Sequence, residues 1–231
     1  MLDSFRVIIA AAGSGSRMNS DINKQYILLE SWPVLKYSLD VFEAFASVAE
    51  IVIVASPREI EYCRQEIVER FGFQKVSKVI AGGKERQDSV WAGLQELAAD
   101  TAYVAIHDGA RPLLSPVLLA NILRAAQEWG AAVPGILARD TLKKVDESSF
   151  VAETLNRSRI VNIQTPQIFK YSNLCEAYEK AYAEGFRGTD DAALFEKYVG
   201  KVKVVPGDHR NIKITTPDDL LIAQTFLTHG Q

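Results

Sequence analysis

Short apolar runs rich in β-branched residues alternate along this chain with stretches of helical periodicity. The runs cover residues 6–12, 50–56, 76–82 and 102–108 and are largely continuous rather than alternating with polar residues. Such runs are typical of strands buried on both faces of a parallel sheet. The alternation therefore predicts an α/β fold, with helices on both faces of a mostly parallel sheet. Ligands of such sheets bind beyond the carboxyl ends of the strands.

The helical stretches carry their own boundary signals. One begins at the Ser-Pro pair of residues 115–116 and closes at Gly130, and another begins at the Thr-Pro pair of residues 216–217. Ser and Thr are favoured N-caps, Pro suits the first helical position, and Gly suits the C-terminal cap. Residues 34–45 and 57–72 also place their apolar side chains on one helical face.

Residues 139–158 break this alternation. They lack a helical period and predict two short strands, 141–145 and 150–155, joined by the turn 146–149. This segment is polar and too small to bury a core of its own. We therefore expect one domain, residues 1–231, from which a hairpin projects toward a second subunit or into solvent.

The net charge, the apolar runs and the cysteines indicate which partners and which cellular location to expect. The formal net charge is −3, whereas a nucleic-acid-binding domain is more often basic, and no apolar run has the length of a membrane span. We expect neither nucleic acid nor membrane as a partner. The N-terminus lacks the pattern of a signal peptide, and Cys63 and Cys175 suit helix cores rather than a disulfide or a zinc site. The expected location is the cytoplasm.

The first apolar run leads into a loop that contains Gly13 and Gly15, followed by two cations, Arg17 and Lys24. Small residues let backbone N–H groups approach a phosphate. Two additional cations suit a more highly charged group, such as a triphosphate. The alternative is a tight strand-to-helix turn with two solvated surface cations.

Two familiar glycine fingerprints do not fit this loop. A dinucleotide site needs a third glycine where Met18 stands, and an acid after the second strand, where the chain has Ser-Pro at residues 56–57. The P-loop pattern is absent as well. A nicotinamide dehydrogenase is therefore disfavoured.

Nearly the whole chain, from Val7 to about Leu227, resembles one family of nucleotidyltransferases. "AAAGSGSRM" with "KQY" resembles the signature of sugar-phosphate nucleotidyltransferases. "AGGKERQDSVWAGL", "IHDGARP", "ARDTLKK", "LNRSRIVNIQTPQIF", "GTDDAALFE" and "NIKITTPDDL" follow in the order of the 2-C-methyl-D-erythritol 4-phosphate cytidylyltransferases of the non-mevalonate isoprenoid pathway. The resemblance implies a Rossmann-like, glycosyltransferase-A-like fold with a projecting β-hairpin arm. It also implies transfer of the cytidylyl group of CTP to methylerythritol phosphate, giving 4-diphosphocytidyl-2-C-methyl-D-erythritol and pyrophosphate.

Two readings compete with this function. Cytidylyltransferases for ribitol 5-phosphate or another polyol phosphate are close relatives, but they tend to carry Gly-Gly and Ser-Val where this chain has Ala12-Gly13 and Gly109-Ala110. A catalytically silent nucleotide-binding protein on the same fold would not need the cations that are present here. The chain departs from the family at Lys84, where an acid is common.

The implied reaction needs positive charge more than proton transfer. The second pKa of a phosphate monoester is about 6, so the attacking phosphate is ionised at neutral pH and needs no general base. The histidines, at positions 107, 209 and 229, form no obvious base–orienter pair. Cations must therefore bring two polyanions together.

The resemblance implies a role for each matched residue. The catalytic residues are Arg17, Lys24, Arg157 and Lys213. The CTP-binding residues are Ala11, Ala12, Gly13, Gly15, Ser16, Gly82, Gly83 and Ser89. The acceptor-binding residues are Asp140, Thr141, Arg157, Thr165 and Lys213.

Asp108 ends a predicted strand and is the candidate ligand of Mg²⁺ or another divalent cation. Its alternative role is an ion pair with Arg111 that shapes the following turn. Lys213 lies in a strand-like segment between Ile212 and Ile214 and points away from their face, which by itself suggests only a solvated side chain.

The resemblance also implies a homodimer. In the family the 139–158 arm reaches into the neighbouring subunit and helps to bind the acceptor. The residues 189–191, "TDD", either cap the next helix or contribute to the site.

Overall fold

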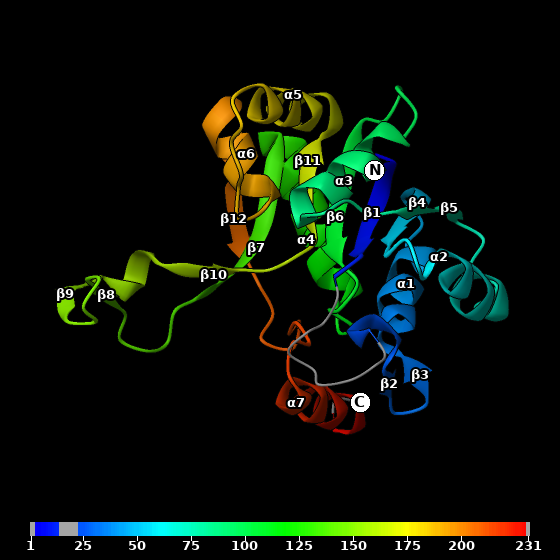
Figure 1. Cartoon of the computed structure of the whole chain (residues 1–231), viewed down its shortest axis with the longest axis horizontal. Helices are drawn as coiled ribbons and strands as arrows, with labels where there is room; N and C mark the ends of the chain where they lie inside the picture. Colours follow the sequence, from blue (N-terminus) through cyan, green and yellow to red (C-terminus); the bar gives the residue numbers. More distant parts are fainter. Residues whose placement is uncertain (1–2, 14–22, 230–231) are drawn as a thin grey trace.

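The computed structural model describes residues 3–13 and 23–229 and contains one large, mostly parallel sheet (Figure 1). Its strands run in the order β10-β7-β11-β6-β1-β4-β5, with β12 beside β7. Strand β1 pairs in parallel with both β4 and β6, β4 pairs in parallel with β5, and β7 in parallel with β12. The strands are β1 (Phe5–Ala11), β4 (Val48–Ala55), β5 (Val76–Ala81), β6 (Tyr103–Asp108), β7 (Ala131–Leu137), β10 (Val161–Ile163), β11 (Gln167–Lys170) and β12 (Lys203–Pro206).

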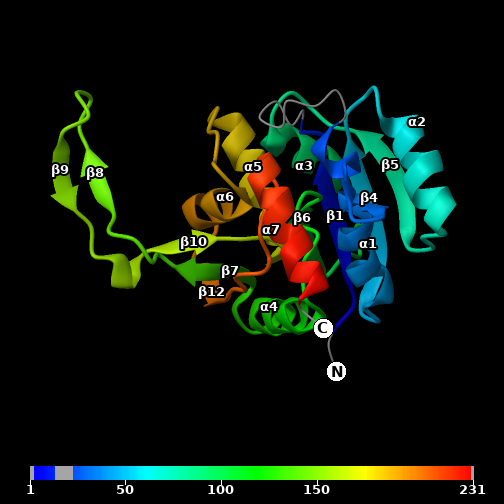
Figure 2. The same cartoon turned by 90° about the horizontal axis from the view of Figure 1, so that it is seen from below.

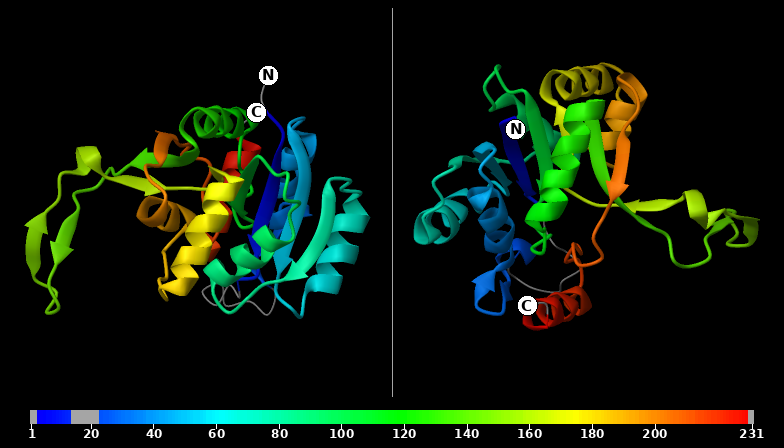
Figure 3. Two further views of the ribbon diagram at one scale, coloured as in Figure 1. Left: turned by 90° about the horizontal axis from the view of Figure 1, so that it is seen from above. Right: turned by 180° about the vertical axis from the view of Figure 1, so that it is seen from behind.

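Helices cover both faces of the sheet, as the sequence predicts (Figures 2 and 3). Val7 and Ile9 of β1 pack in one buried cluster with α1 and α4, whereas Ile8 packs in a second cluster with α3, α5 and α6. Successive side chains of a strand point to opposite faces, so each face has its own apolar core. The helices are α1 (Val34–Ala44), α2 (Ile60–Tyr62) continued by η3 (Cys63–Glu69), α3 (Arg86–Gln95), α4 (Pro116–Trp129), α5 (Tyr171–Ala183), α6 (Asp191–Tyr198) and α7 (Pro217–Thr228).

The predicted helix boundaries are confirmed by their hydrogen bonds. The Ser115 hydroxyl accepts a bond from the Leu118 amide at 3.2 Å, and Gly130 closes α4 with a φ of 84°. Thr216 and Asp219 form a capping box at the start of α7. These caps satisfy amides at the helix starts that would otherwise have no partner.

The predicted hairpin is confirmed as β8 (Lys143–Val145) paired with β9 (Val151–Thr154), and it projects well beyond the sheet (Figures 1 and 2). The short helix η4 (Arg157–Arg159) follows it. Phe150 and Val151 on this arm are 72% and 61% exposed. Apolar side chains exposed together on a projecting element are typical of a surface that contacts a partner.

The mostly parallel sheet has an antiparallel part, and one segment expected to be strand-like is not a strand. Strands β10 and β11 run antiparallel to β7 and β6, so the sheet is mixed at this side. The segment 211–215 is not a strand: the amide of Ile214 bonds to the carbonyl of Ala110 at 2.8 Å, but the amides of Asn211 and Ile212 bond locally to the carbonyls of Asp208 and Arg210. Small elements complete the described chain: η2 (Lys24–Tyr26), β2 (Leu28–Leu29) and β3 (Trp32–Pro33).

Within residues 3–13 and 23–229, no helix is long and apolar enough to cross a bilayer. Cys63 and Cys175 are both free thiols, and they lie in η3 and α5.

Candidate active site

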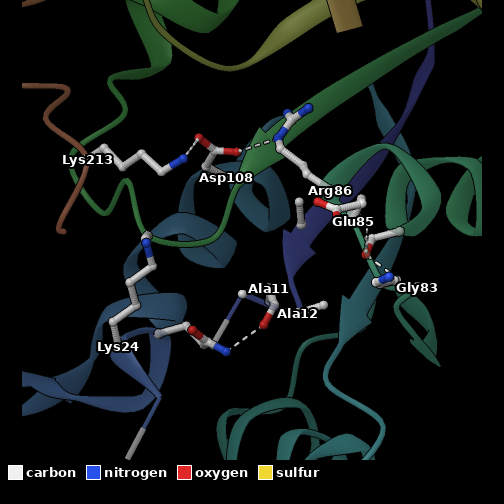
Figure 4. Close-up of a pocket in the computed structure, with 14 residues that line it drawn as sticks. Ala11, Ala12, Lys24, Gly83, Glu85, Arg86, Asp108 and Lys213 are labelled. Atoms are coloured by element: carbon white, nitrogen blue, oxygen red, sulfur yellow. Dashed lines mark hydrogen bonds and ion pairs between the residues drawn. The ribbon is translucent and has the colours of Figure 1, made fainter. Parts of the chain in front are cut away.

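A pocket of about 400 Å³ lies beyond the carboxyl ends of β1 and β6 (Figure 4). Parallel strands place their carboxyl ends at one edge of the sheet, so distant segments of the chain meet there. Of the residues singled out from the sequence, the following line it: Ala11, Ala12, Gly13, Lys24, Gly83, Ser89, Asp108 and Lys213. Lys84, where the chain departs from the family, also faces this pocket.

Asp108 stands at the centre of the charges in this pocket. Lys213 Nζ lies 2.7 Å from Oδ2 of Asp108, Arg86 Nε lies 3.3 Å from Oδ1, and Arg111 Nε lies 3.8 Å from Oδ2. Burial alone would raise the pKa of Asp108, but Arg86, Lys213 and Arg111 together hold it well below its usual range. The carboxylate is therefore ionised at neutral pH.

Arg86 was not singled out from the sequence, although it lies at the start of α3 and lines the pocket. Its Nη1 lies 2.8 Å from Oδ2 of Asp191, a carboxylate that is fully buried. Burial disfavours the charged guanidinium, but Asp191 and Asp108 outweigh it and raise the pKa of Arg86. Of the "TDD" residues, Asp190 caps α6 and Asp191 faces Arg86.

Small residues form the wall of the pocket between β1 and β5. The Ser89 hydroxyl accepts a hydrogen bond from the Gly83 amide and donates one to the Glu85 carbonyl, each at 3.1 Å. A Cβ on Gly82 would collide with the Cβ of Ala12 and lie 2.8 Å from Ser89 Oγ. The close approach of these backbones therefore requires glycine at position 82.

Lys24 reaches the pocket because the adjacent residue, Gln25, holds η2 against the end of β1. The buried Gln25 side chain donates from Nε2 to the Ala11 carbonyl at 2.5 Å, and Figure 4 shows Lys24 on the same side of the pocket as Lys213. Gly15, Ser16 and Arg17, which the resemblance assigns to the nucleotide, lie outside the described residues.

Thr165 lies directly behind the pocket. Its hydroxyl accepts a bond from the Asp108 amide at 3.0 Å and lies 3.2 Å from Nδ1 of His107. Nε2 of His107 lies 3.2 Å from the Arg111 carbonyl. Since a carbonyl can only accept, Nε2 carries the proton and Nδ1 accepts from Thr165. These contacts hold the backbone on both sides of Asp108.

His107 makes the stability of the protein depend on pH. Burial lowers its pKa to about 4; the positive charges of Arg111 and Lys213 act in the same direction, whereas the charge of Asp108 and the hydrogen bond to the Arg111 carbonyl oppose them. Because the unfolded chain binds this proton near pH 6.5, the stabilisation is complete above that pH and is lost as the pH falls toward 4. We expect the free energy of unfolding to drop by about 2 kcal/mol between pH 7 and pH 5.

Urea unfolding at several pH values checks this expectation. The variant His107→Gln, which cannot titrate, serves as the control and should lose little stability over the same interval. A wild-type stability that stays constant from pH 7 to pH 5 would contradict the assignment.

The arm residues do not reach this pocket within one chain. Asp140, Thr141 and Arg157 are exposed and lie outside its lining, and Arg157 Nη1 donates to the Arg139 carbonyl at 2.6 Å. Arg157 thus lies at the base of the projecting arm, outside the lining of the pocket that holds Lys213.

The pocket has a limited set of ligands for a metal. Residues 3–13 and 23–229 contain no cluster of three or more His, Cys, Asp or Glu side chains suited to a metal ion. Asp108 and Glu85 are the carboxylates that line the pocket, and both oxygens of Asp108 are paired with cations. This donor set fits an ion such as Mg²⁺, which takes most of its ligands from phosphate and water.

Comparison with known proteins places the chain among cytidylyltransferases. The family model of 2-C-methyl-D-erythritol 4-phosphate cytidylyltransferase matches residues 5–229. Proteins of that name from Geotalea uraniireducens and Caldanaerobacter subterraneus are 48% and 44% identical, over 95% of this chain and 95% and 97% of theirs. The crystal structure of 4-diphosphocytidyl-2C-methyl-D-erythritol synthase from Anaerococcus prevotii is 34% identical and covers 98% of this chain and 96% of its own, with a TM-score of 0.86. The Thermus thermophilus cytidylyltransferase structure is 30% identical, with a TM-score of 0.78, over 97% and 99% of the two chains.

Proposed function

This chain belongs to the 2-C-methyl-D-erythritol 4-phosphate cytidylyltransferase family, and on that premise we propose how its pocket performs the reaction. The enzyme transfers the cytidylyl group of CTP to methylerythritol phosphate, releasing pyrophosphate, in isoprenoid precursor biosynthesis. The acceptor phosphate attacks the α-phosphorus of CTP, and the bond to the pyrophosphate leaving group breaks.

The wall of small residues binds the nucleoside. Ala12, Gly82 and Gly83 bring backbone groups close together, and Ser89 holds the Gly83 amide in place. Such a wall recognises a pyrimidine by its size and by its hydrogen-bonding edge. Gly13, Gly15 and Ser16 would then present backbone amides to the triphosphate.

Cations on the other side of the pocket bind the phosphates. Lys24, with Arg17 from the loop, stabilises the charge that builds on the transferred phosphoryl group and its leaving group. Lys213 binds the acceptor phosphate, for which it must exchange its 2.7 Å contact with Asp108. The nucleophile is already ionised, and the buried, neutral His107 is not needed as a base.

Asp108 would hold a divalent cation, such as Mg²⁺, against the triphosphate when CTP is bound. The ion would supply additional positive charge to the phosphates. The exchange of Lys213 from Asp108 to the acceptor would free the Oδ2 atom for this role.

A second subunit completes the acceptor site. Asp140, Thr141 and Arg157 lie on or beside the arm and away from the pocket of their own chain. We propose that two chains form a homodimer in which each arm places these residues beside the partner's Lys213. Thr165, behind Asp108, supports the same site from within the chain.

The observation that carries this proposal is the convergence of Lys24, Lys213 and Asp108 on one pocket lined by the small residues of the family signature. The test is pyrophosphate release from CTP and Mg²⁺, with methylerythritol phosphate and ribitol 5-phosphate offered in parallel. Release with methylerythritol phosphate alone is the expected result. Release with ribitol 5-phosphate instead would contradict the acceptor, and no release with either acceptor would contradict the catalytic assignment.

A further inference from the structure

The buried carboxylate of Asp191 contacts Arg86 but does not line the pocket. We propose that Asp191 is a positioning residue that fixes Arg86 against Asp108, and that its loss slows cytidylyl transfer through this chain of contacts. This inference rests on the proposed function and adds to it residues that the family resemblance did not assign.

Arg86 bridges two carboxylates that differ in burial. Its Nη1 lies 2.8 Å from Asp191, whereas its Nε lies 3.3 Å from Asp108 (Figure 4 shows the second contact). Asp191 is fully buried, while Asp108 faces the pocket. The contact to Asp108 is a hydrogen bond, whereas Oδ2 of Asp191 accepts no hydrogen bond within the described residues and is paired with Arg86 by charge alone. A buried carboxylate whose counter-charge is one guanidinium is costly to leave unpaired, so Asp191 holds the guanidinium in place.

Asp191 is itself held rigidly. The Tyr178 hydroxyl donates to its Oδ1 at 2.6 Å, and the buried Tyr178 ring stacks on Trp91 with centroids 5.6 Å apart. Asp191 also begins α6, where a helix N-terminus favours negative charge. The cavity beside the pair measures about 10 Å³, so it offers the guanidinium no second position on that side.

This anchoring matters because phosphates compete for every cation in the pocket. A guanidinium binds phosphate in a bidentate geometry, so an unanchored Arg86 would leave Asp108 for the triphosphate. Asp191 prevents this exchange and leaves Lys213, which is 36% exposed, as the cation that moves. The fixed pair then keeps Asp108 in one orientation while the substrates bind and leave.

A double-mutant cycle tests this chain of action. Asp191→Asn and Arg86→Gln are each expected to lower kcat by about 10- to 100-fold, because small displacements at a reacting centre have effects of this size. If Asp191 acts only through Arg86, the double variant should be about as active as Arg86→Gln alone, since coupled residues are not additive. If the double variant instead loses kcat by the product of the two single-variant factors, the two residues act independently and the proposal is overturned.

The control is Asp190→Asn, at the adjacent position of the same helix start. Asp190 accepts the Ala193 amide at 3.0 Å and does not contact Arg86, and Asn is an equally good N-cap. This variant should keep its kcat even if its Tm falls. A loss of kcat equal to that of Asp191→Asn would reduce the role of Asp191 to helix stability.

Tyr178→Phe keeps the proposal testable if Asp191→Asn does not fold. This variant removes the hydroxyl that holds Asp191 but keeps the stacked ring, so we expect a smaller fall in kcat that disappears in the Arg86→Gln background. An unchanged kcat in Tyr178→Phe would contradict the proposal. An inactive wild type would instead contradict the proposed function, so the two failures are distinguishable.

Discussion

Replacing Lys213 with Ala is expected to lower kcat/KM for the acceptor by about a hundredfold or more, the usual effect of removing one preorganised charge contact. Lys213 lies on the edge of the pocket and is the cation placed to leave Asp108 for an arriving phosphate. Without it, two polyanions must approach each other with one positive charge fewer. Nucleotide binding depends on the opposite wall, so the Kd for CTP should change little.

Steady-state pyrophosphate release and calorimetric titration with CTP measure these two quantities separately. The matched control is Lys201→Ala, which removes an exposed lysine from a loop outside the pocket lining and should behave as wild type. If Lys213→Ala retains its kcat/KM, another group must hold the acceptor phosphate.

Mixing two inactive variants is expected to restore activity. Arg157→Ala and Lys213→Ala should each be nearly inactive alone, because each lacks one cation of the proposed acceptor site. In a mixed dimer, however, one site takes Lys213 from the first chain and Arg157 from the second, and both are intact. Random pairing of co-expressed chains should therefore give about a quarter of the wild-type activity, since half of the dimers are mixed and each has one functional site.

Restored activity in this experiment would exclude the alternative in which each arm serves the pocket of its own chain. If each arm folded back to serve its own pocket, both kinds of chain in a mixed dimer would carry a defective site. Activity would then stay at the level of the separate variants. Size-exclusion chromatography with light scattering establishes whether the mixed chains pair at all, so that absent pairing is not mistaken for a site within one chain.

Sequence patterns within a few residues predicted the strands and the helix ends, which depend on neighbouring residues in the chain. Continuous apolar runs identified β1, β4, β5 and β6, and the position of Asp108 at the end of one run placed it correctly in the pocket. Strand β7 was harder to predict, because its sequence contains Pro134 and Gly135. Both residues are uncommon in a central strand, yet Gly135 permits the close approach of Val204 in β12.

The contacts that were missed join residues far apart in the sequence. The sequence around Arg86 does not indicate that its partner is Asp191. Asp191 begins α6, more than 100 residues later in the chain. The strand expected around Lys213 was wrong, although the side chain does point away from the buried Ile214 and toward the pocket. The role of the arm stays a prediction, because its contacts belong to a second chain.

The register at the base of the arm has an evolutionary consequence. Leu137 at the end of β7 lies opposite Val161 at the start of β10, so the arm leaves and re-enters the sheet at adjacent positions of one antiparallel pair. An insertion whose ends already meet can change in length or sequence with little effect on the core. The arm residues that we propose for the acceptor and the partner chain can therefore change without altering the residues that line the pocket.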